Sequence, residues 1–392
     1  MQSQHRTTAD VTTADVVVVG AGVIGAAIAW RCAQRRIAVV TVDPDPTRGA
    51  WHTAAGMLAP VTELQYTETP LLHLNLDSLR RWPAFAAELA AELGADERAV
   101  GLRRTGTVLV AWDAADLAAL RDLHAFGQRF DIASILIGGR DLRGLEPALA
   151  AGLPGGLHAP DDHQVDPRLL RDALARAGRR RGVRHVTAEV TRVRTTGDRV
   201  EGVDLADGTT LAAPVVVLAA GAWSGTLAGP PPGAVPAVRP VKGQTLRLRL
   251  PGTPVLNHVV RGRVKGNPIY LVPRADGRIV VGASTEEAGF DRSARAGAVY
   301  ELLRDAQSLL PELGEAELAE ISTGLRPGSP DNAPLVGASG ALGGLVVATG
   351  HYRNGVLLTP VTADGVAALL ADGALPDVLH PFAPDRFERI PA

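Results

Sequence analysis

The sequence predicts an α/β protein with two domains, one built on a parallel sheet and a second, substrate-binding one built on an antiparallel sheet. Short β-branched runs such as VVVV at 16–19 are typical of parallel strands that are buried on both faces. Between 238 and 284, the stretches TLRLRL, PIYLVPR and RIVVGAS alternate apolar with polar residues. This alternation predicts antiparallel strands with one face in water. The length of 392 residues fits two domains.

The first strand leads into a glycine-rich turn, and a helical pattern and a second strand follow. Gly20 permits a tight turn, Gly22 lets backbone N–H groups approach a pyrophosphate, and Gly25 lets the helix pack on the strand. Asp43 ends the second strand, 18 positions beyond Gly25, where a carboxylate can accept hydrogen bonds from ribose hydroxyls. The order of elements therefore predicts a Rossmann-like (βαβ) dinucleotide-binding domain. No second GxGxxG motif is present, which disfavours a reductase that passes electrons from NAD(P)H to FAD.

The remaining pattern predicts the other elements and the domain boundaries. We expect helices over 74–98, with Pro83 marking a kink or a restart, and over 113–130, 166–181 and 298–310, with a last helix ending near Asp372. Strands are expected over 105–112, 183–190, 214–225 and 344–349, and a hairpin over 200–211. These elements place the nucleotide-binding domain at 15–98, 150–229 and 320–385, the second domain at 99–149 and 230–319, and a disordered tail at 1–14.

Composition excludes several function classes. Lys plus Arg is 40 and Asp plus Glu is 42, so a formal net charge of -2 gives no reason to expect nucleic acid or an anionic membrane as partner. Cys32 is the only cysteine, which excludes an intrachain disulfide and a cysteine-based zinc cluster, and we expect no metal. The first fourteen residues are polar and no apolar run reaches the length of a membrane span. These features predict a cytoplasmic protein.

Two further segments are suited to a flat, charged ligand. The stretch AAGMLAP at 54–60 is rich in small residues, which let a backbone lie close against a ring or a pyrophosphate. The stretch GHYRNG at 350–355 stands between a predicted strand and a predicted helix. There it would aim free N–H groups and the positive end of a helix dipole at a bound ligand, such as the negative charge of a reduced flavin.

Together these pieces resemble the D-amino-acid oxidase family of flavoproteins, most closely its glycine oxidase branch. The resemblance covers about 15–385. Its most specific stretches are AAGMLAP at 54–60, PVKGQ at 240–244, IYLVPR at 269–274, GLRPG at 324–328 and GHYRNGVLL at 350–358.

The resemblance implies non-covalent FAD and oxidation of an amine that lies alpha to a carboxylate. It implies that glycine, and small amines such as sarcosine or D-alanine, would give the imine or glyoxylate, with hydrogen peroxide formed from O2. In that branch the glycine imine supplies the thiazole ring of thiamine, so the product would be handed to a thiazole synthase. A homotetramer is also implied.

The same resemblance assigns roles to single residues. Arg326 would clamp the substrate carboxylate bidentately, Tyr270 would donate a second hydrogen bond to it, and Arg353 matches another substrate-side position. The positions that match the FAD-lining residues of the family are Val23, Ile24, Asp43, Pro44, Ala55, Gly56, Met57, Val190, His351, Tyr352, Arg353, Asn354, Gly355, Val356 and Leu357.

Several alternatives stay open at this point. The same fold could oxidise D-amino acids or sarcosine, could pass electrons to a quinone, or could serve as a non-catalytic FAD-bearing subunit. An NAD-dependent dehydrogenase is disfavoured by the GHYRNG stretch. His351 is a candidate general base, although the family motif uses its segment to contact the flavin. A flavin linked to cysteine is disfavoured because the only cysteine, Cys32, lies in the first helix.

Overall fold

The computed structural model describes residues 12–251 and 255–387, which divide into two compact units. Unit 1 draws its described residues from 1–50, 171–240 and 326–392, and unit 2 from 51–170 and 241–325. Residues 51–98 and 150–170, which we assigned to the nucleotide-binding domain from the sequence, fall in unit 2 in this division. Of the tail expected to be disordered, residues 1–11 lie outside the described residues, whereas Thr12 and Thr13 form a short strand, β1.

Unit 1 contains the predicted parallel sheet. Its order is β10-β3-β2-β14-β21-β20, and every neighbouring pair is parallel except β20 with β21. All four valines of β2 are buried, as expected for a strand covered on both faces. The strands are β2 (Val16–Val19), β3 (Val39–Val42), β10 (Arg184–Val186), β14 (Val215–Leu218), β20 (Leu335–Ala338) and β21 (Leu345–Thr349).

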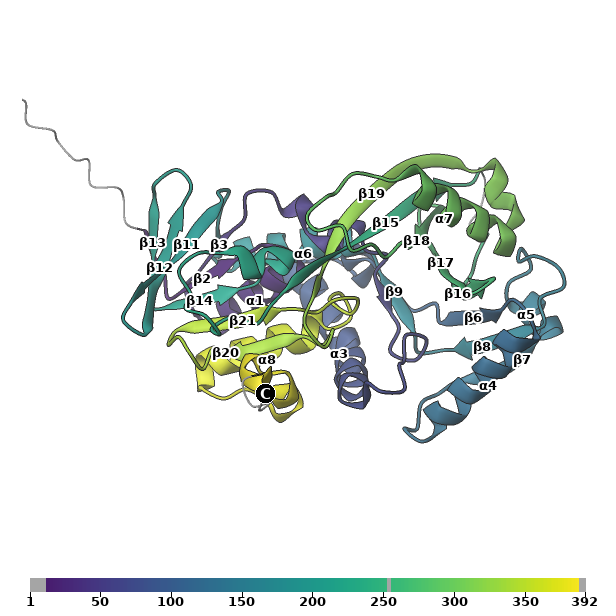
Figure 1. Cartoon of the computed structure of the whole chain (residues 1–392), viewed down its shortest axis with the longest axis horizontal. Helices are drawn as coiled ribbons and strands as arrows, with labels where there is room; N and C mark the ends of the chain where they lie inside the picture. The colour runs from purple at the N-terminus through teal and green to yellow at the C-terminus, as the bar shows by residue number, and fades with distance from the viewer. Residues whose placement is uncertain (1–11, 252–254, 388–392) are drawn as a thin grey trace, which may run out of the picture. The chain divides into compact units, whose positions relative to one another are not determined.

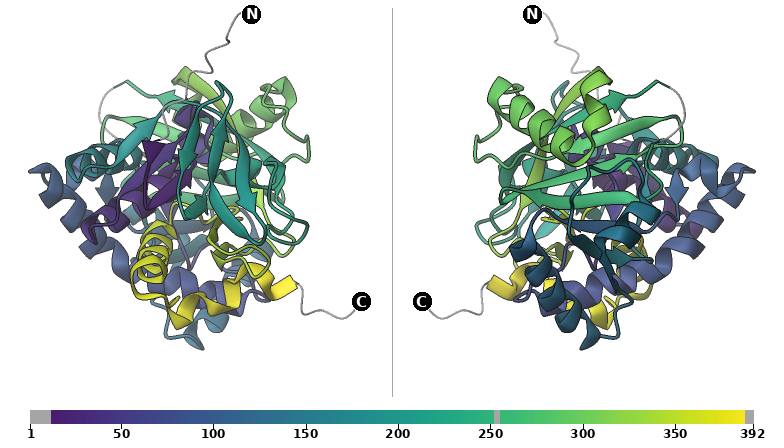
Figure 2. Two further views of the ribbon diagram at one scale, coloured as in Figure 1. Left: turned by 90° about the vertical axis from the view of Figure 1, so that its left-hand side faces the viewer. Right: turned by 90° about the vertical axis from the view of Figure 1, so that its right-hand side faces the viewer.

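The two faces of this sheet are covered differently (Figure 1). Helix α1 (Val23–Gln34) lies over the face that carries Val18 and packs against α8 (Thr359–Asp372), with an ion pair of 2.9 Å between Arg31 and Asp364. On the other face, Val17 and Val19 join an apolar cluster with a four-stranded sheet. The left view of Figure 2 shows those strands beside β2 and β3. The small sheet consists of β1 (Thr12–Thr13), β11 (Val190–Thr196), β12 (Arg199–Leu205) and β13 (Thr210–Ala212).

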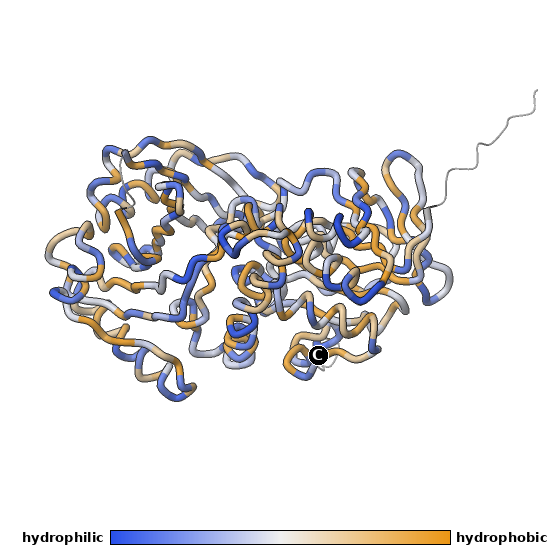
Figure 3. Tube along the Cα trace, turned by 180° about the vertical axis from the view of Figure 1, so that it is seen from behind, coloured by the Kyte–Doolittle hydropathy of each residue, from blue (hydrophilic) through white to orange (hydrophobic). Residues whose placement is uncertain are grey.

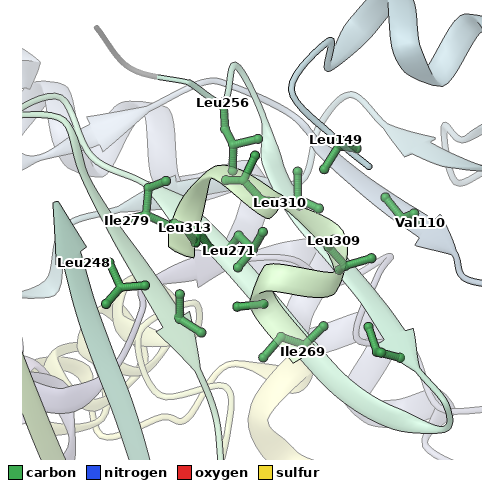
Figure 4. Packing of buried hydrophobic residues seen from close by; sticks show 14 of the residues in the cluster. Val110, Leu149, Leu248, Leu256, Ile269, Leu271, Ile279, Leu309, Leu310 and Leu313 are labelled. Atoms are coloured by element: carbon green, nitrogen blue, oxygen red, sulfur yellow. The ribbon is translucent and has the colours of Figure 1, made fainter. Parts of the chain in front are cut away.

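Unit 2 is built on an eight-stranded sheet of order β19-β15-β18-β17-β16-β6-β8-β7. Its core lies between this sheet and helix α7 (Ala296–Leu309) with the following turn η4 (Pro311–Glu315), where Leu271, Leu309 and Leu310 are fully buried (Figure 4). The strands are β6 (Thr107–Ala111), β7 (Ile135–Gly138), β8 (Gly155–Ala159), β15 (Arg239–Arg249), β16 (Val259–Val264), β17 (Asn267–Pro273), β18 (Arg278–Gly282) and β19 (Glu317–Gly328). The first two residues of β15 and the last three of β19 are counted with unit 1.

The other elements of unit 2 are a three-stranded sheet and several helices. The small sheet has the order β4-β9-β5 and brings Met57 and Leu58 against β9. These elements are β4 (Met57–Leu58), β5 (Leu102–Arg103), β9 (His163–Val165), α3 (Thr69–Leu93), α4 (Ala114–Gln128) and α5 (Gly139–Leu145). Two further helices, α2 (Ala50–Thr53) and α6 (Pro167–Arg180), each cross a boundary of this division.

Two details correct the sequence analysis. Helix α3 runs through Pro83 without a break, so the restart is wrong and the kink stays a prediction. The expected wet face of the antiparallel sheet is wrong for β15, where residues 241–248 are all buried. Arg247, which we placed on that wet face, is only 3% exposed because it pairs with Glu320 and Ser322. Figure 3 shows hydrophobic and hydrophilic stretches alternating along the trace.

No helix among the described residues has the length and apolar character that crossing a membrane requires.

Candidate functional site

The carboxyl ends of three parallel strands, β3, β2 and β21, lie at one edge of the unit 1 sheet, with β14 between β2 and β21. Strand β2 leads into Gly20, β3 leads into Asp43, and β21 leads into Gly350. Because these strands run in the same direction, the three predicted cofactor segments of this unit emerge at the same edge of the sheet. Ligands of open α/β sheets bind at this edge.

Close backbone packing explains two of the three glycines in the first turn. Gly20 has a φ of +100°, and a Cβ there would lie 2.4 Å from the carbonyl oxygen of Ala219. A Cβ on Gly25 would lie 2.0 Å from the carbonyl oxygen of Gly20, so helix α1 can approach β2 only without a side chain. Gly22 is the residue before α1 and is extended, a conformation open to any residue. Its lack of a side chain leaves the helix N-terminus uncovered.

The first turn of α1 offers donors for an anion. The N–H groups of Val23, Ile24 and Gly25 have no acceptor within the helix, and the turn carries no acidic residue. This arrangement is suited to the pyrophosphate of a dinucleotide.

Asp43 is held next to this turn. Its Oδ2 accepts a hydrogen bond of 2.7 Å from the backbone N–H of Ala21, and its Oδ1 accepts one of 3.0 Å from Asp45. Arg171 donates from Nε to the carbonyl oxygen of Ala21 at 3.1 Å, which fixes the turn from its other side. A carboxylate has about four acceptor positions, so Asp43 keeps capacity for ribose hydroxyls. Pro44 follows it and is exposed, while Val190 is buried beneath the sheet at the start of β11.

The GHYRNG stretch forms a tight loop between β21 and α8. Gly350 has a φ of +71° and Tyr352 one of +45°, and the Tyr352 N–H donates to the carbonyl oxygen of Pro327 at 3.0 Å. Asn354 N–H donates to the His351 carbonyl at 2.9 Å, which closes the loop. Among the described residues of unit 1, the N–H groups of Gly355 and Val356 find no acceptor. They are donors available to a ligand.

His351 does not suit the role of general base. Its side chain is 3% exposed, its Nε2 lies 3.0 Å from Oγ1 of Thr362, and burial lowers its pKa to about 3. A histidine in this environment is neutral at physiological pH and packs its loop onto α8.

The two arginines predicted on the substrate side lie in different surroundings within unit 1. Arg326 is half-buried near the end of β19. Arg353 is exposed, and its guanidinium lies over the ring of Tyr352, with 5.4 Å from its central carbon to the ring centroid. A guanidinium stacked in this way is oriented by the aromatic face beneath it.

The predicted residues of unit 2 gather on one apolar cluster. Ala55, Met57 and Tyr270 pack with Val259, Val272 and Val280. Tyr270 stands opposite Gly282 in the register of β17 and β18, and a Cβ on Gly282 would lie 2.3 Å from the tyrosine hydroxyl. Glycine at that position therefore makes room for the phenol.

The backbone of the 54–57 stretch has hydrogen-bond donors that a cofactor could use. Ala55 and Gly56 are buried, yet neither N–H has an acceptor among the described residues of unit 2. Buried backbone N–H groups almost always find a partner, so an acceptor supplied by a ligand would complete this stretch. Gly56 has a φ of +74°, and a Cβ there would lie 1.9 Å from the Val165 carbonyl oxygen, so only glycine fits.

Sequence reasoning missed the polar support behind this stretch. Arg274 holds the Ala55 carbonyl oxygen, Arg168 and Arg247 hold that of His52, and Glu320 pairs with Arg168 and Arg247. Of these four residues, only Arg274 lies in a stretch that carries the family resemblance. The arginines of TLRLRL carried no signal that separates an inward from an outward side chain. The described residues contain no cluster of histidine, cysteine, aspartate or glutamate that could hold a metal ion.

Fold and donor set together define a dinucleotide-binding protein of the flavoprotein type. Residues 15–369 match the family described as FAD dependent oxidoreductase (DAO). The chain belongs to this family, and its cofactor is FAD.

Individual members of the family are similar to this chain over most of its length. The chain is 36% identical over 361 residues to a glycine oxidase of Geobacillus kaustophilus, covering 91% of this chain and 93% of that protein. It is 34% identical over 364 residues to the "Bifunctional protein ThiO/ThiG" of Synechocystis sp., covering 92% of this chain and 52% of that protein, so it spans about half of that relative. The crystal structure of glycine oxidase from Geobacillus kaustophilus matches with a TM-score of 0.87, covering 96% of this chain and 99% of that chain at 34% identity.

The burial of His351 predicts how the free energy of unfolding depends on pH. A pKa that falls from about 6.5 unfolded to about 3 folded gives stability that is present in full above pH 6.5 and is lost as the pH falls toward 3. Between pH 7 and pH 5, this histidine should lower the free energy of unfolding by about 2 kcal/mol. In His351→Gln this part of the pH dependence should be absent. Urea unfolding at both pH values measures it. His380→Gln, at a side chain 58% exposed, is the control. A His351→Gln variant as acid-sensitive as the parent would contradict the assignment.

Proposed function

We propose that this chain catalyses the FAD-dependent oxidative deamination of glycine and of small amines such as sarcosine or D-alanine. The products would be the imine, or glyoxylate after hydrolysis, and hydrogen peroxide. The observation that carries the proposal is the near full-length similarity to a glycine oxidase, at 36% identity. The chain also has Tyr270 and Arg326 at the positions that the resemblance assigns to substrate binding.

The substrate carboxylate is bound by this chain's own side chains in the proposal. Arg326 offers a planar guanidinium that can form two parallel hydrogen bonds with a carboxylate. Tyr270 donates a further hydrogen bond, with its ring supported by Val272 and Val280. Arg353 is the third substrate-side residue. Because these groups fix the carboxylate, they orient the alpha carbon and its hydrogen, and such orientation can contribute most of the rate.

Proton transfer needs no side-chain base in this scheme. The chemistry that FAD supplies is acceptance of a hydride equivalent from the alpha carbon and return of two electrons to O2. The amine enters neutral after losing its proton to water. His351 takes no part in this transfer, because its Nε2 is occupied by Thr362.

We propose cofactor positions for each unit separately. In unit 1 the pyrophosphate would lie at the N-terminus of α1, Asp43 would bind ribose, and the loop from His351 to Leu357 would line the flavin. In unit 2 the N–H groups of Ala55 and Gly56 would serve the flavin or the pyrophosphate. The support is a set of N–H groups without acceptors in their own unit.

The place of the reaction in metabolism is also a proposal. We infer that the glycine imine is supplied to a thiazole synthase for thiamine, and a relative whose name is bifunctional supports a coupled second activity. The homotetramer stays a prediction of the resemblance, and the cytoplasmic location stays a prediction from the composition.

A substrate panel tests the proposal. Hydrogen peroxide and keto-acid formation should be measured with glycine, sarcosine, D-alanine and L-alanine in air. We expect peroxide with glycine and sarcosine, accompanied by glyoxylate, and little with L-alanine. Turnover that needs an added dye or quinone in place of O2 would instead identify a dehydrogenase. Activity confined to larger D-amino acids would contradict glycine as the substrate and would identify a D-amino-acid oxidase of the same fold.

Replacement of the clamp gives a second test. Arg326→Met should raise KM for glycine on the order of 100-fold, because a carboxylate would lose its charged partner. FAD binding should stay unchanged. The control is Arg194→Met, which removes an arginine from the exposed part of β11 in the same unit. An unchanged KM in Arg326→Met would contradict the clamp assignment.

A further inference from the structure

The carbonyl oxygens of the 52–56 stretch are held by an unusual set of donors, all within unit 2. His52 O accepts from Nη2 of Arg247 at 2.9 Å and from Nε of Arg168 at 3.1 Å. Thr53 O accepts from Oγ1 of Thr245 at 3.0 Å, and Gly56 O accepts from the Val165 N–H at 2.9 Å. Four carbonyls of this five-residue stretch are therefore fixed, the fourth being that of Ala55.

Ala55 O is held by a buried charge. It accepts a hydrogen bond of 2.5 Å from Nη2 of Arg274, whose side chain is 6% exposed. Nη1 of Arg274 donates to Oε1 of Gln164 at 2.9 Å, and its Nε lies 3.7 Å from the Asp166 carboxylate. The guanidinium thus has a partner on every side, and it cannot turn away from the Ala55 carbonyl without losing them.

Because the peptide bond is planar, this contact also fixes the orientation of the next N–H group. The carbonyl of Ala55 and the N–H of Gly56 belong to one trans peptide unit, so they point in opposite directions. When Arg274 fixes the carbonyl, it also fixes the direction of the Gly56 N–H. That N–H is buried and has no acceptor among the described residues of unit 2.

We propose that Arg274 is a positioning residue, which aims the Gly56 N–H at an acceptor atom of bound FAD. The inference rests on the proposed placement of 55–57 at the cofactor. A positively charged, hydrogen-bonded donor behind the carbonyl also polarises the peptide, which strengthens its N–H as a donor.

Arg274→Met tests the proposal by removing every donor while keeping a long apolar side chain. FAD titration of the apoprotein should show a dissociation constant raised about tenfold or more, the loss expected for a hydrogen bond to a polar cofactor atom. If the lost bond favours reduced flavin tenfold over oxidised flavin, the midpoint potential falls by about 30 mV. Arg274→Lys, which keeps a charged donor, should recover part of both changes.

The matched control is Arg103→Met. Arg103 is a partly buried arginine of unit 2 that also donates to a backbone carbonyl, that of Pro273, at 2.7 Å. We expect its variant to bind FAD within about twofold of the parent, because ordinary substitutions away from a site change little. A folded Arg274→Met variant with the parent's dissociation constant and midpoint potential would overturn the proposal.

If Arg274→Met does not fold, hydrogen exchange of the parent protein tests the same proposal. In the parent apoprotein, the amides of 54–58 should exchange more slowly once FAD is added. If FAD binds and these amides gain no protection, the positioning proposal fails while the FAD assignment stands. If the apoprotein takes up no FAD at all, the proposed function itself fails.

Discussion

The shared direction of β2, β3 and β21 is the constraint on which the proposed cofactor site of unit 1 depends. Each strand delivers a different group to the same sheet edge: a glycine turn, an acidic residue and the GHYRNG loop. Close backbone contact at Gly20 and Gly25 then sets how near α1 approaches that edge. The N-terminus of α1, with its free donors, follows from this contact, and no charged side chain of that turn is required.

In the proposed function, unit 2 would offer backbone N–H groups to the cofactor. The carbonyl oxygens of His52, Thr53 and Ala55 accept hydrogen bonds from the side chains of Thr245, Arg168, Arg247 and Arg274. Burial lowers the pKa of both Arg247 and Arg274 to about 10, which still leaves them charged at neutral pH. Buried charges are costly unless they are paired, and Glu320, Asp166 and the carbonyl oxygens provide the partners.

The sequence predicted correctly those elements that depend on interactions between residues close together in the chain. The VVVV run, the GAGVIG turn and the helix after it could be recognised because periodicity and glycine spacing reflect burial and turn geometry directly. The family itself could be recognised from five short stretches. Inward-facing Arg247 could not be predicted, because alternation does not distinguish a wet face from a face lined with paired charges. The burial of His351 likewise depends on α8, whose packing is not visible in a loop motif.

The central claim is that a chain with these backbone donors binds FAD and uses it to oxidise glycine. The visible spectrum of the purified protein, recorded before and after glycine is added without oxygen, tests that claim most directly. The account predicts a flavin spectrum that bleaches with glycine and returns when air is admitted. A colourless protein that cannot take up FAD, or a bound flavin that neither glycine nor another small amine bleaches, would contradict it.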